Sequence, residues 1–336
     1  MKIGDFDLDQ QVLIVAEIGN NHEGNFEVAR EMVEEAAKCG VDAVKFQTFK
    51  TEHYVNQGDS ARFERLKSFE LTYPEFEELS NLAHSQGLMF VSTPFDLASA
   101  SFLNSIVDSY KIASGDNAFY PLIEKVALTG KPMIVSTGIS NAEQVKRTVD
   151  FVKQTWIRND VIGQLAILHC VSSYPVPSDQ VNLRSIQFLI ENFEDVIGYS
   201  DHALGIEAAV LATALGSQII EKHFTLDKNF SDFRDHQLSA DPPEMRDLVK
   251  QIRLTSSMLG ENRKQVENCE EEVVTAIRRS IVAGRDMPVG HHVDMSDLTW
   301  LRPSGGLVPG EEEALIGKLL KREVSFGEQL LVTDVE

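Results

Sequence analysis

The chain has 336 residues, with 31 basic and 52 acidic side chains, and its formal net charge is −21. This charge disfavours binding to nucleic acid or to an anionic membrane, because both partners require a basic surface. Hydrophobic residues make up 43% of the chain and charged residues 25%, which is typical of a globular protein and excludes a disordered chain. No apolar run reaches the roughly 18–20 residues of a membrane helix. The N-terminal segment lacks the apolar core of a signal peptide.

The cysteines indicate a reducing environment. Cys39, Cys170 and Cys269 match the spacing of no zinc motif, and an odd number argues against a complete disulfide framework. The simplest interpretation of each is a small buried hydrophobic residue. We therefore expect a cytoplasmic protein.

Eight short β-branched segments, each followed by a stretch with helical pattern, fill the first three quarters of the chain. They begin at Val12, Asp42, Leu88, Ser109, Pro132, Gln164, Val196 and Ser217. Nearly continuous apolar strands between helices indicate a parallel sheet that is covered on both faces. Eight such units in about 250 residues predict a (β/α)8 barrel, or TIM barrel. No glycine-rich phosphate-binding motif is present, so we expect no nucleotide cofactor.

The character of the sequence changes after residue 260. Residues 261–277 are highly charged and are predicted to form a linker or an exposed helix. Residues 278–336 read as short strands and turns, with frequent proline and glycine. A domain of about 60 residues has only a small core, so we expect it to dock on another surface.

Two histidines form a candidate metal site. His202 and His223 each lie six residues after the start of one of two consecutive predicted strands, which places them at similar depth. Adjacent strands are about 5 Å apart, and two imidazoles at that separation can bind one metal ion. No thiolate accompanies them, so oxygen ligands from water, a carboxylate or substrate would complete a site for Mn²⁺ or another divalent first-row ion. The alternative is that both are ordinary core or surface residues.

Two lysines form a candidate anion site. Lys45 and Lys111 lie near the ends of predicted strands, and nearly every other strand end carries Ser or Thr. Alternation of side chains places Gln47 on the same face as Lys45. The lysines could lie on the surface, form a Schiff base or bind an anion. The surrounding hydroxyl and amide groups favour a pocket for phosphate and carboxylate groups.

The chain also resembles a known family. The segments that carry the resemblance follow one another as AEIGNNHEGN, KFQTF, STPFD, YKIASGD, STG, LHCVSSYPVP, GYSDH and EKHFTLD. Together they resemble the sialic acid synthase family, which condenses phosphoenolpyruvate with an N-acylated amino sugar. The tail from SIVAGRDMPVGHHV to LRPSGG is similar to the antifreeze-like (SAF) domain of that family. The resemblance implies a TIM-barrel catalytic domain over residues 1–260 and a SAF domain over residues 278–336. It also implies a domain-swapped homodimer.

The resemblance assigns roles to individual residues. Glu17 would be the acid/base group, and His202 and His223 would hold a divalent metal, with Mn²⁺ favoured over Mg²⁺ or Co²⁺. Phosphoenolpyruvate would contact Lys45, Gln47, Thr93, Lys111, Ser114, Ser136 and Ser200. The sugar would contact Tyr174, Asp235 and Arg302.

Several alternatives remain open at this point. Phe46 stands where sialic acid enzymes usually carry His, and FRDH from Phe233 to His236 replaces a GPDH-like stretch. The KFQTF segment is more similar to the legionaminate-type and spore-coat-polysaccharide branches. The sugar could therefore be N-acetylmannosamine, or a related hexose that leads to legionaminic or pseudaminic acid. A Schiff-base pyruvate-dependent aldolase and a non-catalytic carbohydrate- or ice-binding protein are the other functional classes considered.

Overall fold

The computed structural model describes all residues from Met1 to Glu336. The chain separates into two compact units, Met1–Gly260 and Glu261–Glu336. Each unit has a hydrophobic core of its own. None of the helices combines the length and hydropathy that are needed to cross a lipid bilayer.

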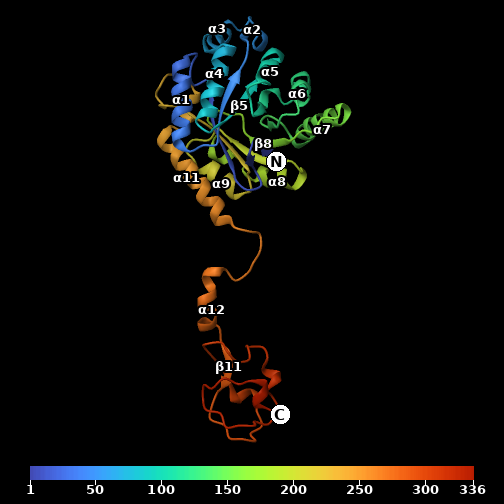
Figure 1. Cartoon of the computed structure of the whole chain (residues 1–336), viewed down its shortest axis with the longest axis vertical. Helices are drawn as coiled ribbons and strands as arrows, with labels where there is room; N and C mark the ends of the chain where they lie inside the picture. Colours follow the sequence, from blue (N-terminus) through green and yellow to red (C-terminus); the bar gives the residue numbers. More distant parts are fainter. The chain divides into compact units, whose positions relative to one another are not determined.

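The first unit is a closed barrel of parallel strands in the order β10-β3-β4-β5-β6-β7-β8-β9. Figure 1 shows its strands surrounded by helices. Its strands are β3 (Leu13–Gly19), β4 (Ala43–Thr48), β5 (Met89–Pro94), β6 (Ser109–Ile112), β7 (Met133–Ser136), β8 (Leu165–Cys170), β9 (Val196–Asp201) and β10 (Ile219–His223). Each predicted strand segment contains one of these strands. The predicted (β/α)8 barrel is therefore confirmed.

Helices follow the strands and cover the barrel. The main helices are α1 (Phe26–Cys39), α4 (Tyr73–Ser85), α5 (Leu97–Leu103), α6 (Tyr120–Ala127), α7 (Ala142–Asn159), α8 (Arg184–Asn192), α9 (Glu207–Ala214) and α11 (Pro242–Leu259). Further helices lie in two of the loops, α2 (Thr51–Tyr54) and α3 (Ser60–Phe69) after β4, and α10 (Asp235–Leu238) after β10. Local signals set the ends of α1: the Asn25 side chain accepts hydrogen bonds at its start, and Gly40 ends it with a left-handed φ of 82°.

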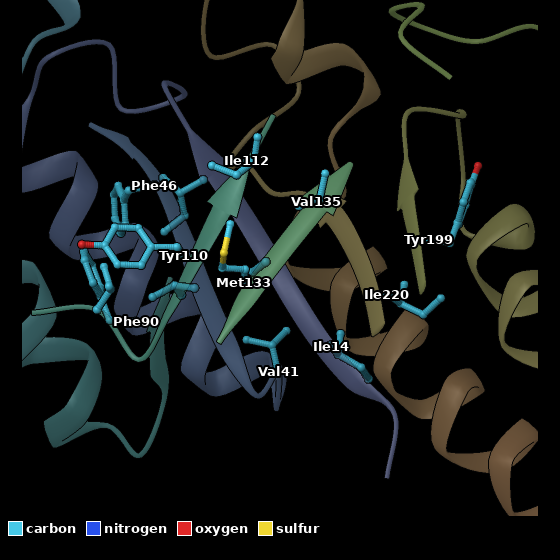
Figure 2. Packing of buried hydrophobic residues seen from close by; sticks show 14 of the residues in the cluster. Ile14, Val41, Phe46, Phe90, Tyr110, Ile112, Met133, Val135, Tyr199 and Ile220 are labelled. Carbon is cyan, nitrogen blue, oxygen red and sulfur yellow. The ribbon is translucent and has the colours of Figure 1, made fainter. Parts of the chain in front are cut away.

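The largest core lies between the strands and the surrounding helices (Figure 2). Phe46 belongs to it, with its ring stacked on Phe90 at a centroid distance of 5.6 Å and tilted against His22 at 6.1 Å. The residue that replaces the family's usual His therefore packs in the core and does not line the cavity described below.

A smaller core fills the barrel interior at the N-terminal ends of the strands. The hairpin of β1 (Lys2–Ile3) and β2 (Phe6–Asp7) supplies Ile3 to this cluster, which also contains Leu13 and Ile219. Because apolar side chains occupy this end of the barrel, polar chemistry is confined to the C-terminal ends of the strands.

The second unit contains α12 (Glu271–Ile277) and an antiparallel pair, β11 (Ser280–Ala283) with β12 (Leu298–Leu301). Its remaining chain forms turns around a core that includes Ile281, Val293 and Leu320. The single 3₁₀ turns of the whole chain are η1 (Ser114–Asp116), η2 (Ser178–Gln180), η3 (Asn268–Glu270), η4 (Met295–Asp297), η5 (Glu312–Ala314) and η6 (Val332–Asp334).

Candidate active site

A cavity of about 830 Å³ lies at the C-terminal ends of the barrel strands. The predicted site residues that line it are Glu17, Lys45, Gln47, Thr93, Lys111, Ser114, Ser136, Tyr174, Ser200, His202, His223 and Asp235. Arg302 belongs to the second unit, where it is exposed directly after β12. The barrel thus brings together all of the predicted site residues that it contains.

Strand register sets the depth of these side chains. Ser200 of β9 pairs with Glu221 of β10, so the next inward-facing positions are His202 and His223. His223 also pairs with Glu17 of β3. The imidazole centroids of His202 and His223 are 5.3 Å apart. The matched depth that the sequence predicted for these two histidines is confirmed.

Glu221 is the charged centre of the cavity. Its Oε1 atom accepts from Lys45 Nζ at 3.0 Å, from Lys111 Nζ at 3.1 Å and from Ser200 Oγ at 2.9 Å. A second carboxylate, that of Glu17, lies 3.3 Å from Lys45 Nζ. All four charged residues are buried. Alternation along the predicted strand places Glu221 on the same face as His223, two residues away, but no role was predicted for Glu221. This two-residue spacing was the one feature of the sequence that could have identified it as a site residue.

The two carboxyl groups have opposite tendencies to hold a proton. Burial raises the pKa of Glu17 against the opposing effect of Lys45, and the charge of Glu221 raises it further. Burial would also raise the pKa of Glu221, but Lys111 and Lys45 outweigh burial and lower it well below its usual range. Pairs of carboxyls with divergent pKa values divide acid/base and electrostatic roles. Glu17 is therefore the group suited to carry a proton.

The histidine pair fits a divalent metal ion. His202 Nδ1 is 2.8 Å from the carbonyl oxygen of Val171, which directs the lone pair to Nε2. Burial lowers the pKa of His202, but the Cys170 sulfur, 3.7 Å from Nδ1, and the Val171 carbonyl together outweigh burial and raise it. Burial lowers the pKa of His223 well below its ordinary value, which keeps this imidazole neutral, and its Nδ1 has no hydrogen-bond partner.

The chain offers no group of three or more His, Cys, Asp or Glu side chains arranged around a metal position. An ion held by the two histidines would therefore keep several positions for water or substrate oxygen, which is the arrangement of a catalytic site.

Several polar atoms that line the cavity lack partners. Asn20 Oδ1, Ser136 Oγ and Ser172 Oγ are buried and form no hydrogen bond. Buried polar groups in native proteins are nearly always satisfied. Their position on the cavity wall points to a polar ligand that supplies the missing hydrogen bonds.

The loops after β8 and β10 carry three further residues of the cavity wall, Tyr174 from the first loop and Arg234 and Asp235 from the second. The Tyr174 ring lies 4.2 Å from that of His202, and Arg234 stacks over Tyr174 with its guanidinium carbon 4.7 Å from the ring centroid. Arg234 also contacts Asp235 at 3.3 Å. Burial raises the pKa of Asp235 against the opposing charge of Arg234.

Three other charged residues on the cavity wall were not predicted from the sequence. Arg62 and Arg65 belong to α3, and Asp116 belongs to η1. Exposed charges on a short helix look like a solvated face, so nothing in the sequence separated the two arginines from ordinary surface residues.

The sequence matches the models of two known protein families. Residues 32–264 match the model of the NeuB family, and residues 278–336 match the model of the SAF domain. The chain belongs to the NeuB family. The resemblance to sialic acid synthases that the motifs predicted is thereby confirmed.

Named relatives of this NeuB protein span most of its length. An N,N'-diacetyllegionaminic acid synthase of Legionella pneumophila is 39% identical, over 96% of this chain and 94% of the relative. The human N-acetylneuraminate-9-phosphate synthase is 34% identical, over 85% of this chain and 82% of the relative. The crystal structure of the N-acetylneuraminic acid (sialic acid) synthetase of Leptospira borgpetersenii serovar Hardjo-bovis, in complex with citrate, has a TM-score of 0.76 and 33% identity. That match covers 81% of this chain and 94% of the other.

Proposed function

We propose that this protein is a transferase that condenses phosphoenolpyruvate with an N-acylated amino sugar, producing a nonulosonic acid and phosphate. The observation that carries the proposal is one cavity in which Lys45 and Lys111 share Glu221 as counter-ion beside the His202–His223 pair, in a member of the NeuB family. The names of the relatives support the same reaction class.

The phosphoenolpyruvate subsite consists of Lys45, Gln47, Thr93, Lys111, Ser114, Ser136 and Ser200. Gly138 keeps the wall beside it open, because an added Cβ would lie 2.2 Å from Ser172 Oγ and 2.7 Å from Ser114 Oγ. Ser114 Oγ instead accepts a hydrogen bond from the Gly138 amide at 3.0 Å. The two ammonium groups bind phosphate and carboxylate oxygens by charge-assisted hydrogen bonds.

The sugar subsite lies beside the histidines. His202 and His223 would hold the divalent metal, with Mn²⁺ as the first choice and Mg²⁺ or Co²⁺ as alternatives. When bound, the metal supplies Lewis-acid polarisation of the sugar's aldehyde group. Tyr174 and Asp235 orient the sugar so that its aldehyde carbon faces phosphoenolpyruvate, and holding both reactants together lowers the entropic cost of their encounter.

Bond changes then follow a condensation with C–O cleavage. C3 of phosphoenolpyruvate forms a bond with the aldehyde carbon, and the aldehyde oxygen takes the proton of Glu17 to become a hydroxyl group, which leaves Glu17 ionised. Water adds at C2 and gives its proton to Glu17, whose raised pKa suits it to general base and acid work. The C2–O bond to phosphate breaks, phosphate leaves with the bridging oxygen and takes the proton of the new C2 hydroxyl group, and C2 becomes a ketone.

The SAF domain is proposed to complete the site from a second subunit. Residues 278–336 would cap the partner's barrel, with Arg302 against the sugar and residues 261–277 as the connection. The matched SAF model, the small core and the exposed position of Arg302 support this assignment. Mixing a Glu17→Ala subunit with an Arg302→Ala subunit should restore activity, since a hybrid dimer has one intact site. No recovery after demonstrated subunit exchange would contradict capping in trans.

The sugar itself is left open by the relatives' names. Phosphoenolpyruvate adds three carbons to a hexose, so C9 of the product is C6 of the sugar. One relative is named for a 9-phosphate and the other for an acid without phosphate. N-Acetylmannosamine, its 6-phosphate and diacetylated amino sugars are therefore all candidates.

The deciding experiment combines product analysis with isotopic labelling. The protein is incubated with Mn²⁺, an N-acyl amino sugar panel and phosphoenolpyruvate labelled with ¹⁸O at the bridging oxygen. We expect a nonulosonic acid by mass spectrometry and label in the released phosphate. Activity should disappear with a chelator and in His202→Ala and His223→Ala. Activity that resists chelation, together with borohydride trapping of a lysine adduct, would instead establish the Schiff-base aldolase.

A further inference from the structure

Two of the cationic side chains on the cavity wall differ from the others. Lys45 and Lys111 contact Glu221, and Arg234 contacts Asp235. Arg62 and Arg65, which line the same cavity, belong to no ion pair within the chain. They are therefore the cavity's guanidinium groups that have no carboxylate partner.

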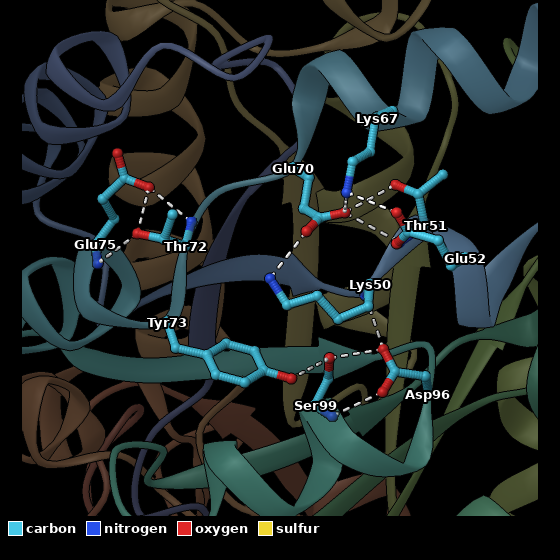
Figure 3. Close-up of polar contacts among 10 residues, drawn as sticks. All are labelled: Lys50, Thr51, Glu52, Lys67, Glu70, Thr72, Tyr73, Glu75, Asp96 and Ser99. Carbon is cyan, nitrogen blue, oxygen red and sulfur yellow. Dashed lines mark hydrogen bonds and ion pairs between the residues drawn. The ribbon is translucent and has the colours of Figure 1, made fainter.

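Helix α3 presents both arginines together. Residues three apart lie on the same side of a helix, so Arg62 and Arg65 are neighbours on its surface. The helix is capped at its start by Asp59, whose side chain accepts from the Arg62 amide at 3.4 Å. It ends at Glu70, which accepts from Lys50 at 2.9 Å and from Lys67 at 3.1 Å (Figure 3).

Aromatic side chains pack against the C-terminal end of helix α3. Phe69, the last residue of α3, is buried with Phe49 and Phe95, and its ring lies 5.2 Å from that of Phe233. The Glu70 carboxylate also accepts from the amide and hydroxyl of Thr51, both at 3.0 Å (Figure 3). Burial would raise the pKa of Glu70, but Lys50 and these other donors lower it to about 2, so the carboxylate stays ionised. Helix α3 is thus held in place by aromatic contacts of Phe69 and, at its C-terminal end, by the ion pairs of Glu70.

The cavity has an inner part, around the buried residues Lys45, Lys111 and Glu221, and an outer part, around the exposed residues Arg62 and Arg65. The two parts differ in whether their positive charges have carboxylate partners. The inner part holds two lysines and two carboxyl groups, and these positive charges already have partners. Asp116 lines the same cavity and acts on Tyr54, whose ring lies 6.0 Å from the Arg62 guanidinium carbon. Asp116 forms no ion pair with Arg62. In a chain of charge −21, two adjacent unpaired arginines on a cavity wall are arranged for an anion.

We propose that Arg62 and Arg65 bind a phosphoryl group at C6 of the amino sugar, so that the preferred substrate is a hexosamine 6-phosphate. This inference rests on the proposed function. The sugar's C1 must lie at the histidine pair to react, and C6 is the carbon farthest from C1 along the open chain. Arg62 and Arg65 are exposed, whereas His202 and His223 are buried, so C6 extends outward to the arginines. Two guanidinium groups match a dianionic phosphoryl group, because each donates paired hydrogen bonds.

The test compares N-acetylmannosamine with N-acetylmannosamine 6-phosphate in the intact protein. We expect kcat/KM of the wild type to be at least tenfold higher for the phosphorylated sugar. Arg62→Gln and Arg65→Gln should each lower kcat/KM at least tenfold for the phosphorylated sugar and less than twofold for the free sugar. The KM for phosphoenolpyruvate should not change. Arg30 is a partly exposed arginine on helix α1, outside the cavity wall, so Arg30→Gln is the control variant and should affect neither sugar.

Each other outcome has a definite meaning. Equal turnover of both sugars by the wild type overturns the inference and leaves the proposed function intact. A rise only in the KM for phosphoenolpyruvate shows that the arginines bind that substrate's phosphate, and also overturns it. If neither sugar reacts and the diacetylated amino sugars give no product either, the proposed function fails. Calorimetry with N-acetylmannosamine 6-phosphate then decides the inference separately: binding that the double variant loses supports the site, and no binding overturns it.

Discussion

Replacing Glu221 by Gln tests the charge arrangement of the cavity most directly. The substitution keeps the shape of the side chain and removes its charge. Three donors then lose their charged acceptor, because Lys45, Lys111 and Ser200 all contact the same Oε1 atom at 2.9–3.1 Å. Glu17, 3.3 Å from Lys45, remains as the only carboxylate beside either lysine.

The expected loss of stability is large. Removing one partner of a buried ion pair typically costs about 3–5 kcal/mol, because the other charge stays buried without compensation. The free energy of unfolding of a native protein is only about 5–15 kcal/mol. We therefore expect Glu221→Gln to lose about 3 kcal/mol without substrate. Phosphoenolpyruvate brings negative charge to the uncompensated lysines, so it should stabilise the variant more than the wild type.

The assay is urea unfolding followed by circular dichroism, with and without phosphoenolpyruvate, at neutral pH. Glu244→Gln is the matched control, since Glu244 forms an ion pair with Lys228 at 2.6 Å and both side chains are partly exposed. That change should cost no more than about 1 kcal/mol. If Glu221→Gln costs as little as the control and gains no extra stability from phosphoenolpyruvate, the proposed charge arrangement is wrong.

Further predictions concern the cavity wall and its supporting loops. Ile139 has a left-handed φ of 54° and is 74% exposed, so Ile139→Gly should raise the free energy of unfolding by about 1 kcal/mol; a decrease in urea unfolding would show that the side chain stabilises the fold. Burial raises the pKa of Asp116 from 3.8 to about 6, so the stability it contributes is fully present below pH 3.8 and is lost as the pH rises through about 6. Asp116→Asn should therefore unfold with a flatter pH profile over this range, and an unchanged profile would contradict the shift. Glu23 accepts from His236 at 3.0 Å in the loop that carries Asp235, so Glu23→Gln should raise the sugar KM severalfold and leave the KM for phosphoenolpyruvate unchanged. Equal changes in both constants would indicate general loosening of the barrel.

Much of the fold followed from local signals. Each strand is a short apolar segment between turn residues, and α1 has an amphipathic pattern whose ends are marked by Asn25 and Gly40. Alternation along a strand also correctly placed Lys45 with Gln47 on the cavity wall. These features depend on residues that are close together in the sequence, so the sequence alone was enough to predict them.

The interactions inside the cavity depend on closure of the barrel. Lys111 and Glu221 are 110 positions apart, and their 3.1 Å contact exists only because strands on different sides of the barrel point inward at the same depth. Sequence spacing cannot tell which lysine meets which carboxylate, nor which carboxyl holds the proton. The same limit applies to Arg62 and Arg65, because only the path of the loop after β4 brings α3 to the cavity.

The paired charges explain how an acidic protein can bind a strongly anionic substrate. Two lysines buried alone would be costly and would lose their protons, as burial lowers the pKa of Lys111 even with Glu221 present. Glu17 and Glu221 raise the pKa of Lys45 against the effect of burial, so this lysine stays charged before substrate arrives. An entering phosphate or carboxylate then takes over contacts that the protein's own carboxylates had made. Because the pKa of Glu17 is already raised, added negative charge favours its protonation, and that proton is then available when the aldehyde oxygen becomes a hydroxyl group.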